Sequence, residues 1–354
     1  MKVLIAEPIS NEGIDILRSY AQVDIKLGLE PEEIISIIGD YEALVVRSQT
    51  RVSAKMIQAG EKLQVIARAG VSVDNIDVET ATRHGIVVVH APTGNTISAA
   101  EHTIALMLAL ARHIPQANAT LKSGIWRRTD FMGIEVRNKT LGIIGLGNVG
   151  SEVARRARGL EMKLIAHDPF ISVDHAHNLQ VELVSLEQLL QESDFITIHL
   201  PLTKSTKRLI GAKELSLVKP TARIINTARG DLIDEQALAK AIKEKRVAGA
   251  AIDVFPTEPT TQSVLFDNDN VIVTPHLGAS TIEAQAMVAK DVANQIIAVF
   301  KGQPARYSVN APFVAVETLP ILAPFIKLAA IAGKLVSQLA EGQMNAIQIR
   351  YEGE

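Results

Sequence analysis

Three side chains that acid/base chemistry uses follow apolar runs in the second half of the chain. His276 lies in "TPHLGAST" after "NVIVT", Glu258 lies in "PTEPTT" after "AAIDVF", and Arg229 lies in "NTARGD" after "ARIIN". An imidazole exchanges a proton near neutral pH, and a carboxylate beside it fixes its tautomer. A guanidinium grips a carboxylate in two places. Together these residue types predict proton transfer to or from a substrate that carries an acid group.

Each of these residues also has a structural interpretation. A single His at a strand end is often a capping or surface residue, Glu258 between prolines fits a loop charge, and Arg229 fits a helix start or an ion pair. The carboxyl ends of parallel strands, however, share one edge, and open α/β sheets bind ligands there. Their common position favours the catalytic interpretation.

The elements that would position them are short apolar runs alternating with helical patterns. Five runs fall within residues 1–93 and a second series starts at Lys139, which predicts two α/β domains. Near-continuous Val, Ile and Leu are typical of parallel strands buried on both faces. We also expect a long helix from about Ser98 through Lys122, and an amphipathic helix from Leu319 to Leu339 followed by the strand "AIQIRY".

The second series opens on "LGIIGLGNVG", in which Gly145, Gly147 and Gly150 have the order G-x-G-x-x-G. A strand before the glycines and a helix after them are the context of a dinucleotide-binding turn. Asp168 closes the next run, "KLIAHD", where a carboxylate accepts hydrogen bonds from a ribose and repels a 2′-phosphate. The glycine turn and Asp168 together predict that the cofactor is NAD. The alternative is that the glycines only pack a helix on a strand and Asp168 is a solvated strand end.

Composition limits the partners. Charged residues are 21% with a net charge of -3 and aromatic residues are 4%, which argues against a nucleic-acid surface. The apolar runs are shorter than the roughly 18 to 20 residues that a bilayer requires, and the N-terminus lacks a secretory signal. Zero cysteines exclude disulfides, thiolate catalysis and Cys-ligated zinc. We expect a cytoplasmic protein with no metal site and no membrane or nucleic-acid partner.

The sequence resembles the D-isomer-specific 2-hydroxyacid dehydrogenases. The resemblance is carried by "GIIGLGNVG", "NTARGDLIDEQAL", "AAIDVFPTEP" and "NVIVTPHLGAST", and in the first half by "VVRSQT" and "ARAGVSVDNIDVETATRHGIVVVHAPTGN". It implies an α/β fold in which a Rossmann NAD-binding domain, residues 98–279, is inserted into a flavodoxin-like substrate domain, residues 1–97 and 280–302. Residues 303–354 would start an additional domain with a helix and a strand.

The resemblance also implies residue roles. Arg229 would bind the substrate carboxylate, His276 would take the hydroxyl proton, and Glu258 would hold His276. The residues implied to bind the cofactor are Gly145, Gly147, Asn148, Val149, Gly150, Asp168, Thr227, Ala228, Arg229, Asp253, His276 and Ala279. The residues implied to bind the substrate are Arg47, Ser48, Gly70, Val71, Trp126, Arg127 and Arg229.

The activity implied is NAD-dependent oxidation of 3-phospho-D-glycerate to 3-phosphohydroxypyruvate, the first step of L-serine biosynthesis. Arg47 would serve the phosphoryl end, and the arm "GIWRRTDFMG" would join a homodimer or a higher homo-oligomer. One alternative is a glyoxylate or hydroxypyruvate reductase of the same family. An alternative of another class is an NAD-sensing binding protein similar to the corepressors among the family's relatives.

Overall fold

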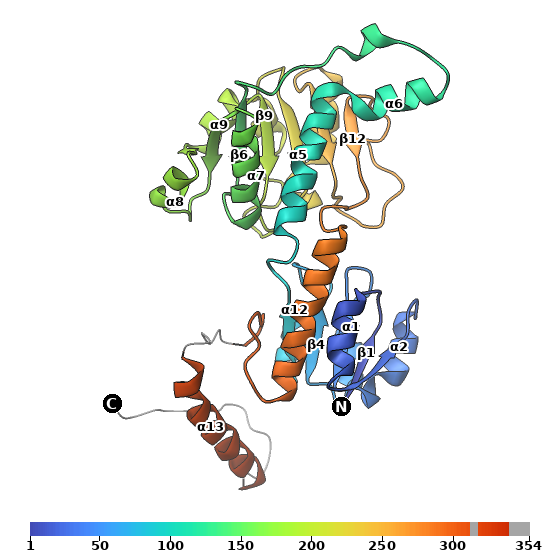
Figure 1. Ribbon diagram of the computed structural model, residues 1–354, viewed down its shortest axis with the longest axis vertical. Coiled ribbons are helices and arrows are strands. Elements are labelled where there is room, and N and C mark those ends of the chain that lie inside the picture. Colours follow the sequence, from blue (N-terminus) through green and yellow to red (C-terminus); the bar gives the residue numbers. More distant parts are fainter. Residues whose placement is uncertain (312–317, 340–354) are drawn as a thin grey trace. The chain divides into compact units, whose positions relative to one another are not determined.

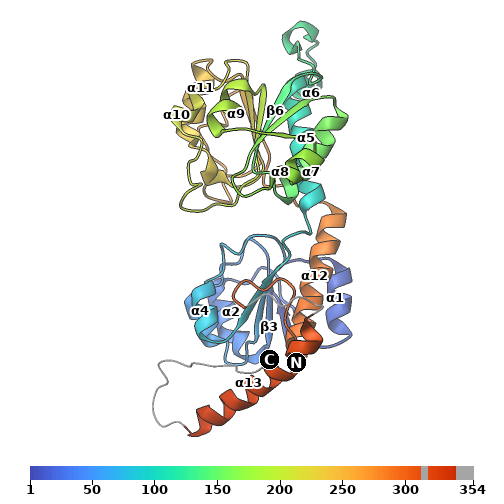
Figure 2. The same cartoon turned by 90° about the vertical axis from the view of Figure 1, so that its left-hand side faces the viewer.

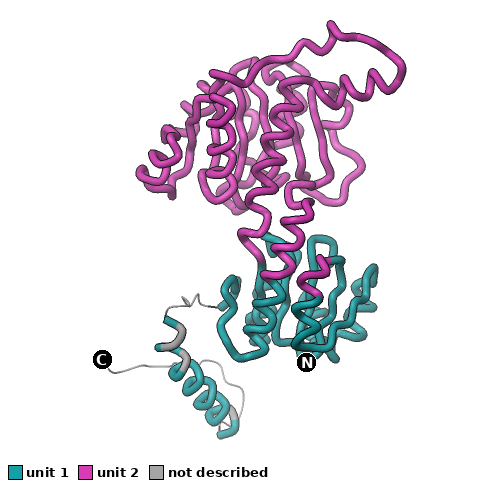
Figure 3. Tube along the Cα trace, viewed as in Figure 1, with its two compact units in different colours: residues 1–8, 15–90, 292–354 teal, residues 9–14, 91–291 magenta. Residues whose placement is uncertain are grey.

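The structure is a computed structural model that describes residues 1–311 and 318–339. The chain divides into two compact units (Figure 3). Unit 1 contains Met1–Pro8, Asp15–His90 and the described part of Val292–Glu354, and unit 2 contains Ile9–Ile14 and Ala91–Asp291. The predicted domain boundaries, including the assignment of residues 303–354, stay predictions.

Unit 1 is built on a five-stranded parallel sheet with the order β2-β1-β3-β4-β5, which is the flavodoxin-type doubly wound order. Helices α2 and α4 lie on one face, and α1 and α12 lie on the other (Figure 2). The strands are β1 (Lys2–Ile5), β2 (Gln22–Ile25), β3 (Ala43–Val46), β4 (Val65–Arg68) and β5 (Val87–His90). The helices are α1 (Asn11–Arg18), α2 (Pro31–Ile37), the 3-10 turn η1 (Ile38–Asp40), α3 (Ala54–Ala59) and α4 (Val78–Arg83). Helices α1 and α12 (Ile282–Phe300) contribute residues to both units.

Unit 2 is built on a seven-stranded parallel sheet with the order β12-β11-β10-β9-β6-β7-β8. Counted within the unit this is the Rossmann order with one added edge strand, and it reverses between β6 and β9. The strands are β6 (Thr140–Ile144), β7 (Lys163–His167), β8 (Glu182–Leu183), β9 (Phe195–Ile198), β10 (Arg223–Asn226), β11 (Gly249–Ile252) and β12 (Val271–Val273). The parallel α/β prediction is confirmed, although the two-residue strand β8 was too short to predict.

Helices cover both faces of the unit 2 sheet, as Figures 1 and 2 show. One apolar cluster contains Met107 from α5 and Val153 from α7, and another contains Leu190 from α9 and Leu238 from α11. Burial on both faces explains the continuous apolar runs of the central strands. The helical elements are α5 (Thr96–Arg112), α6 (Ile114–Lys122), η2 (Arg128–Phe131), α7 (Asn148–Gly159), α8 (Val173–Asn178), α9 (Leu186–Glu192), α10 (Ala212–Leu215), η3 (Gly230–Leu232) and α11 (Glu235–Lys243).

The prediction of one long helix from Ser98 through Lys122 is wrong. His113 takes a left-handed conformation with φ 53° and separates α5 from α6. Pro115 has no N–H to donate to the carbonyl of Ala111, four residues earlier, and its ring clashes with a continuing helix. The Ala111 carbonyl instead accepts a hydrogen bond from Ile134 N at 2.9 Å. The break therefore turns the chain away into the segment that precedes β6.

The predicted helix from Leu319 to Leu339 is present as α13. The predicted strand "AIQIRY" lies outside the described residues. None of the helices in the described ranges has both the length and the apolar character needed to cross a bilayer.

Candidate active site

The turn after β6 contains Gly145, Gly147 and Gly150, and its geometry gives a reason for glycine at each position. Gly145 has φ 93°, a conformation that favours glycine. A Cβ on Gly150 would lie 2.0 Å from the Gly145 carbonyl oxygen, so only glycine lets α7 start so close to β6. A Cβ on Gly147 would meet nothing within 4 Å. The backbone at Gly147 therefore borders open space, where a ligand can approach the turn closely.

Helix α7 starts at this turn without a side-chain cap, since its N-cap is Gly147. Its first N–H groups have no intrahelical acceptors, and a helix N-terminus favours negative charge. Asn148 and Val149 are the first two residues of the helix. The open backbone and the uncapped helix end fit the pyrophosphate of a dinucleotide.

Asp168 follows β7 and is held beside the same turn. Its Oδ2 accepts a hydrogen bond from Leu146 N at 2.9 Å, and its Oδ1 accepts one from Phe170 N at 2.9 Å. A carboxylate oxygen can accept more than one hydrogen bond, so both oxygens keep capacity for ribose hydroxyls. The structure brings Asp168 and the glycines together, as a dinucleotide requires.

Arg229 stands in a turn after β10 that Asn226 organises. Asn226 Oδ1 accepts a hydrogen bond from Ala228 N at 3.0 Å, and its Nδ2 donates to Arg229 O at 2.8 Å. Gly230 lies so close to the chain after β11 that a Cβ there would approach Phe255 C to 2.0 Å. The turn that presents Thr227, Ala228 and Arg229 is thus fixed at both ends. Asn226 was not predicted, although an Asn before a turn is a signal for this kind of local bond.

His276 and Glu258 form a direct pair. His276 Nδ1 lies 2.6 Å from Glu258 Oε2, and Glu258 Oε1 accepts a hydrogen bond from Phe255 N at 2.9 Å. Burial alone would raise the pKa of Glu258, but the bonds from His276 and Phe255 hold it below its ordinary value. An ionised carboxylate accepts, so Nδ1 carries a proton and Nε2 of the neutral ring has a lone pair. The pair suits a proton acceptor with a fixed tautomer.

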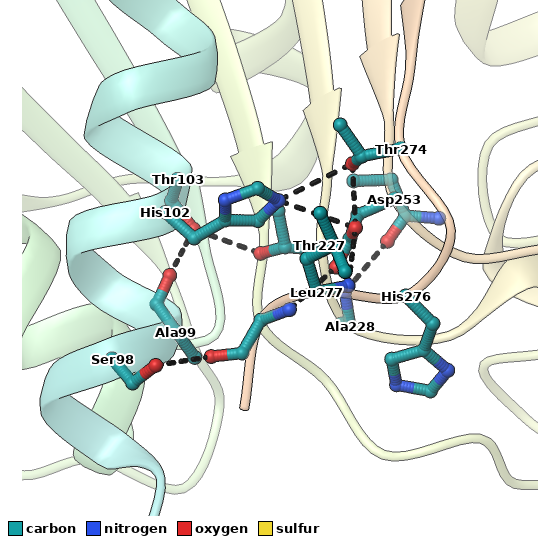
Figure 4. A network of polar contacts seen from close by, with 12 residues as sticks. Ser98, Ala99, His102, Thr103, Thr227, Ala228, Asp253, Thr274, His276 and Leu277 are labelled. Carbon is teal, nitrogen blue, oxygen red and sulfur yellow. Dashed lines mark hydrogen bonds and ion pairs between the residues drawn. The ribbon is translucent and has the colours of Figure 1, made fainter. Parts of the chain in front are cut away.

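The backbone that carries His276 is held by Asp253, whose side chain is fully buried (Figure 4). Asp253 Oδ1 accepts hydrogen bonds from Thr274 Oγ1 at 2.5 Å and Leu277 N at 2.8 Å, and Oδ2 accepts one from Gly278 N at 2.9 Å. His276 N donates to Asp253 O at 2.8 Å. These bonds fix a loop in which His276 has φ 55°.

His102 of α5 completes this network and was not predicted. Its Nε2 lies 3.2 Å from both Thr274 Oγ1 and Asp253 Oδ1. The Thr274 hydroxyl already donates to Asp253, so His102 donates from Nε2. Burial alone would raise the pKa of Asp253, yet the bonds from His102 and Thr274 keep it below its ordinary value. The sequence holds no signal for the contact between His102 and Thr274, which are 172 positions apart.

Two more predicted residues line this region. Thr227 is buried and its Oγ1 lies 2.8 Å from Thr103 Oγ1 on α5. Ala279 follows Gly278 in the loop, and its carbonyl accepts a hydrogen bond from Gln285 at 2.8 Å. The strand-end residues and the glycine turn thus belong to one edge of the unit 2 sheet, the edge at the carboxyl ends of its strands.

The remaining predicted residues belong to other segments. Arg47 and Ser48 follow β3, and Gly70 and Val71 follow β4, all in unit 1. Trp126, in unit 2, is 79% exposed. Arg127 Nη1 lies 3.9 Å from Asp130 Oδ2. Across the described part of the chain, no hydrogen bond or ion pair joins either arm residue to the strand-end group. Residues 1–311 and 318–339 also contain no group of three His, Asp or Glu that could hold a metal.

A Rossmann-type sheet, a dinucleotide turn and an imidazole–carboxylate pair at one sheet edge define the class of NAD-linked dehydrogenases. The family model described as "D-isomer specific 2-hydroxyacid dehydrogenase, NAD binding domain" matches residues 104–278. The chain belongs to the D-isomer-specific 2-hydroxyacid dehydrogenase family, as predicted.

Curated relatives extend the similarity over the whole chain. A D-3-phosphoglycerate dehydrogenase of Synechocystis sp. is 53% identical over 353 residues, 100% of this chain and 64% of the relative. One of Archaeoglobus fulgidus is 49% identical over 356 residues, 100% of this chain and 68% of the relative. The chain therefore spans about two thirds of the length of these relatives.

Solved structures give the same fold. The TT0316 protein from Thermus thermophilus superposes with a TM-score of 0.81 at 31% identity, covering 87% of this chain and 100% of that one. A glyoxylate reductase from Paecilomyes thermophila superposes with a TM-score of 0.78 at 30% identity, covering 87% of this chain and 98% of that one.

Proposed function

We propose that this protein catalyses NAD-dependent oxidation of 3-phospho-D-glycerate to 3-phosphohydroxypyruvate, the first step of L-serine biosynthesis. The observation that carries the proposal is the 2.6 Å contact between His276 Nδ1 and Glu258 Oε2 at the carboxyl edge of a Rossmann-type sheet. The curated relatives named above as D-3-phosphoglycerate dehydrogenases support this choice of substrate.

In the proposed reaction His276 Nε2 takes the proton of the substrate's C2 hydroxyl, because Nδ1 is bonded to Glu258. Glu258 stabilises the imidazolium that results. Arg229 grips the substrate carboxylate through its planar guanidinium. Bound NAD supplies the acceptor for the hydride that leaves C2. His276 therefore ends the oxidation protonated and must release that proton before the next turnover.

The cofactor would be held by residues that the structure gathers around the glycine turn and the strand ends. The N–H groups at the start of α7 would bind the pyrophosphate, and Asp168 would bind the adenosine ribose. The other residues proposed for this site are Thr227, Ala228, Asp253 and Ala279. In unit 1, Arg47, Ser48, Gly70 and Val71 would bind the substrate.

A homo-oligomer is part of the proposal. The arm between α6 and β6 exposes large apolar side chains, with Trp126 79% and Met132 82% exposed. Large apolar side chains exposed along one segment are typical of contact surfaces when they form a continuous patch. Trp126 and Arg127 would lie at a neighbouring subunit. A chain that sediments as a monomer would contradict this part of the proposal. A cytoplasmic location is also proposed, supported by a sequence without cysteine.

A second candidate is a glyoxylate or hydroxypyruvate reductase, because one similar solved structure is a glyoxylate reductase. The test follows NADH oxidation with 3-phosphohydroxypyruvate, hydroxypyruvate and glyoxylate, with His276→Ala as the inactive control. We expect turnover that prefers 3-phosphohydroxypyruvate. A preference for glyoxylate would support the second candidate. Absence of turnover with all three would contradict both and leave a binding role.

A further inference from the structure

Glu7 is a buried carboxylate that the proposed reaction does not use. It follows β1 and is 5% exposed. Its Oε1 accepts hydrogen bonds from Arg47 N and Thr50 N, both at 2.8 Å, and its Oε2 accepts one from Gln49 N at 3.2 Å. A buried charge needs such partners. One side chain therefore holds three of the four backbone N–H groups of the segment 47–50.

Asn75 holds the carbonyl groups of the same segment. Its Nδ2 donates to Arg47 O at 2.8 Å and to Thr50 O at 2.6 Å. Val52 N donates to Asn75 O at 2.8 Å, which extends the connection beyond the segment. Glu7 and Asn75 thus bind complementary backbone groups of one short loop. A loop held in this way loses much of the freedom of an ordinary connection.

Asn75 also ends the loop that starts at Gly70 and Val71. That loop is fastened at its other end, where His90 Nδ1 lies 2.5 Å from Val71 O. Both segments to which we assign substrate contacts in unit 1 are therefore joined through one amide. The hydrogen bonds of Glu7 and Asn75 therefore fix the backbone of these segments within unit 1.

The hydrogen bonds of Glu7 and Asn75 determine which donors of the 47–50 segment stay available to a substrate. Among the described residues, Ser48 N–H alone of the four has no protein acceptor, and Ser48 is exposed. Within residues 1–311 and 318–339, the Arg47 guanidinium makes only one hydrogen bond, a long one of 3.4 Å from Nη1 to Pro8 O. The Ser48 N–H, the Ser48 hydroxyl and the Arg47 guanidinium are thus adjacent donors on a fixed backbone, a set that suits the oxygens of a phosphoryl group.

We propose that Glu7 and Asn75 are positioning residues that set the preference for a phosphorylated substrate, by holding the 47–50 segment so that Arg47 and Ser48 bind the phosphoryl group. This inference rests on the proposed function. It predicts that loosening the loop affects the phosphorylated substrate more than one that lacks the phosphate, because only the former needs these donors.

The test compares kcat/KM for 3-phosphohydroxypyruvate with kcat/KM for hydroxypyruvate in the full chain. The variants are Glu7→Gln, which places an NH2 donor among backbone donors, and Asn75→Asp, which places a carboxylate against two carbonyls. We expect the ratio of the two constants to fall about tenfold or more in each variant, mainly through KM. Glu61→Gln is the matched control on an exposed side chain of unit 1 and should keep the ratio.

Hydrogen exchange at Gln49 and Thr50 gives a second measurement that needs no activity, and exchange should be faster in Glu7→Gln. Equal losses on both substrates would mean a structural role and would overturn the proposal. An unchanged ratio with faster exchange would also overturn it while leaving the proposed function intact. A wild-type chain without preference for the phosphorylated substrate would instead contradict the proposed function, and the inference with it. Thermal melting checks folding, and Glu7→Asp, which keeps a carboxylate, should retain more of the ratio than Glu7→Gln.

Discussion

His276 and Glu258 lie 18 positions apart in the sequence, yet Nδ1 of the first and Oε2 of the second are separated by 2.6 Å. The second oxygen of Glu258 is bonded to Phe255 N, so the carboxylate is oriented from both sides. The pair leaves Nε2 of His276 as the nitrogen that exchanges a proton with a substrate. The proposed chemistry depends on this tautomer.

Replacing His276 by Ala should lower kcat by about 10² to 10⁴-fold, because the reaction then lacks its positioned base. Stopped-flow and steady-state measurement of NADH formation would give kcat, and fluorescence titration would report whether NADH still binds. His84→Ala is a matched control, since His84 is exposed and, among the residues that the structure describes, its ring bonds only to Thr80 O. A His276→Ala variant with wild-type kcat would eliminate this residue as the base.

Replacing Glu258 by Gln should lower kcat by up to about 10²-fold at every pH between 5 and 8. The pKa of Glu258 lies below its ordinary value of 4.5, so the carboxylate is ionised throughout this range and its charge can stabilise the imidazolium at each pH. The measurement is a pH profile of kcat for both proteins. Equal kcat in the two proteins across the whole range would contradict the role assigned to the Glu258 carboxylate.

Replacing Asp253 by Asn should lower the free energy of unfolding and make this free energy depend less on pH in the acid range. The folded pKa of Asp253 is depressed, so its stabilisation is present above the unfolded value, near 3.8, and is lost as pH falls through the lower folded value. At neutral pH we expect the free energy of unfolding to fall by about 1–3 kcal/mol, because the Asn amide cannot accept hydrogen bonds from all the donors that now bond to Asp253.

Urea unfolding of wild type and Asp253→Asn between pH 2 and 7 measures this directly. The gap in the free energy of unfolding should narrow as pH drops below about 4. A gap that stays constant over the whole series would refute the assigned role of the ionised carboxylate.

Substitutions at the glycines of the turn should distinguish an effect on folding from an effect on cofactor binding. Gly147→Ala adds a Cβ that meets nothing within 4 Å, so the fold should keep its melting temperature while NADH binding weakens at least tenfold. Gly150→Ala places a Cβ 2.0 Å from Gly145 O, so it should lower the melting temperature itself. Gly159→Ala, also in open space but at the far end of α7, is the control. Equal NADH affinity in Gly147→Ala and wild type would contradict the placement of the pyrophosphate.

Much of the unit 2 sheet was readable from sequence because its strands are buried on both faces, and burial leaves continuous runs such as "TLGII". The candidate site was readable where chemistry follows a strand directly, as at Arg229 and His276. The supporting bonds were not: His102 reaches Asp253 from a helix whose pattern shows only its apolar face. The break at His113 was also missed: the Ala- and Leu-rich pattern continues up to it, and the sequence signal for the break is Pro115, which the prediction did not use.

Whether this protein acts on 3-phosphohydroxypyruvate through His276 is decided by the ratio of kcat/KM for 3-phosphohydroxypyruvate to that for glyoxylate. The ratio is measured by NADH oxidation with purified wild-type chain and with His276→Ala. We expect a ratio well above one and loss of both activities in the variant. A ratio below one, or turnover that survives in His276→Ala, would contradict the proposed function.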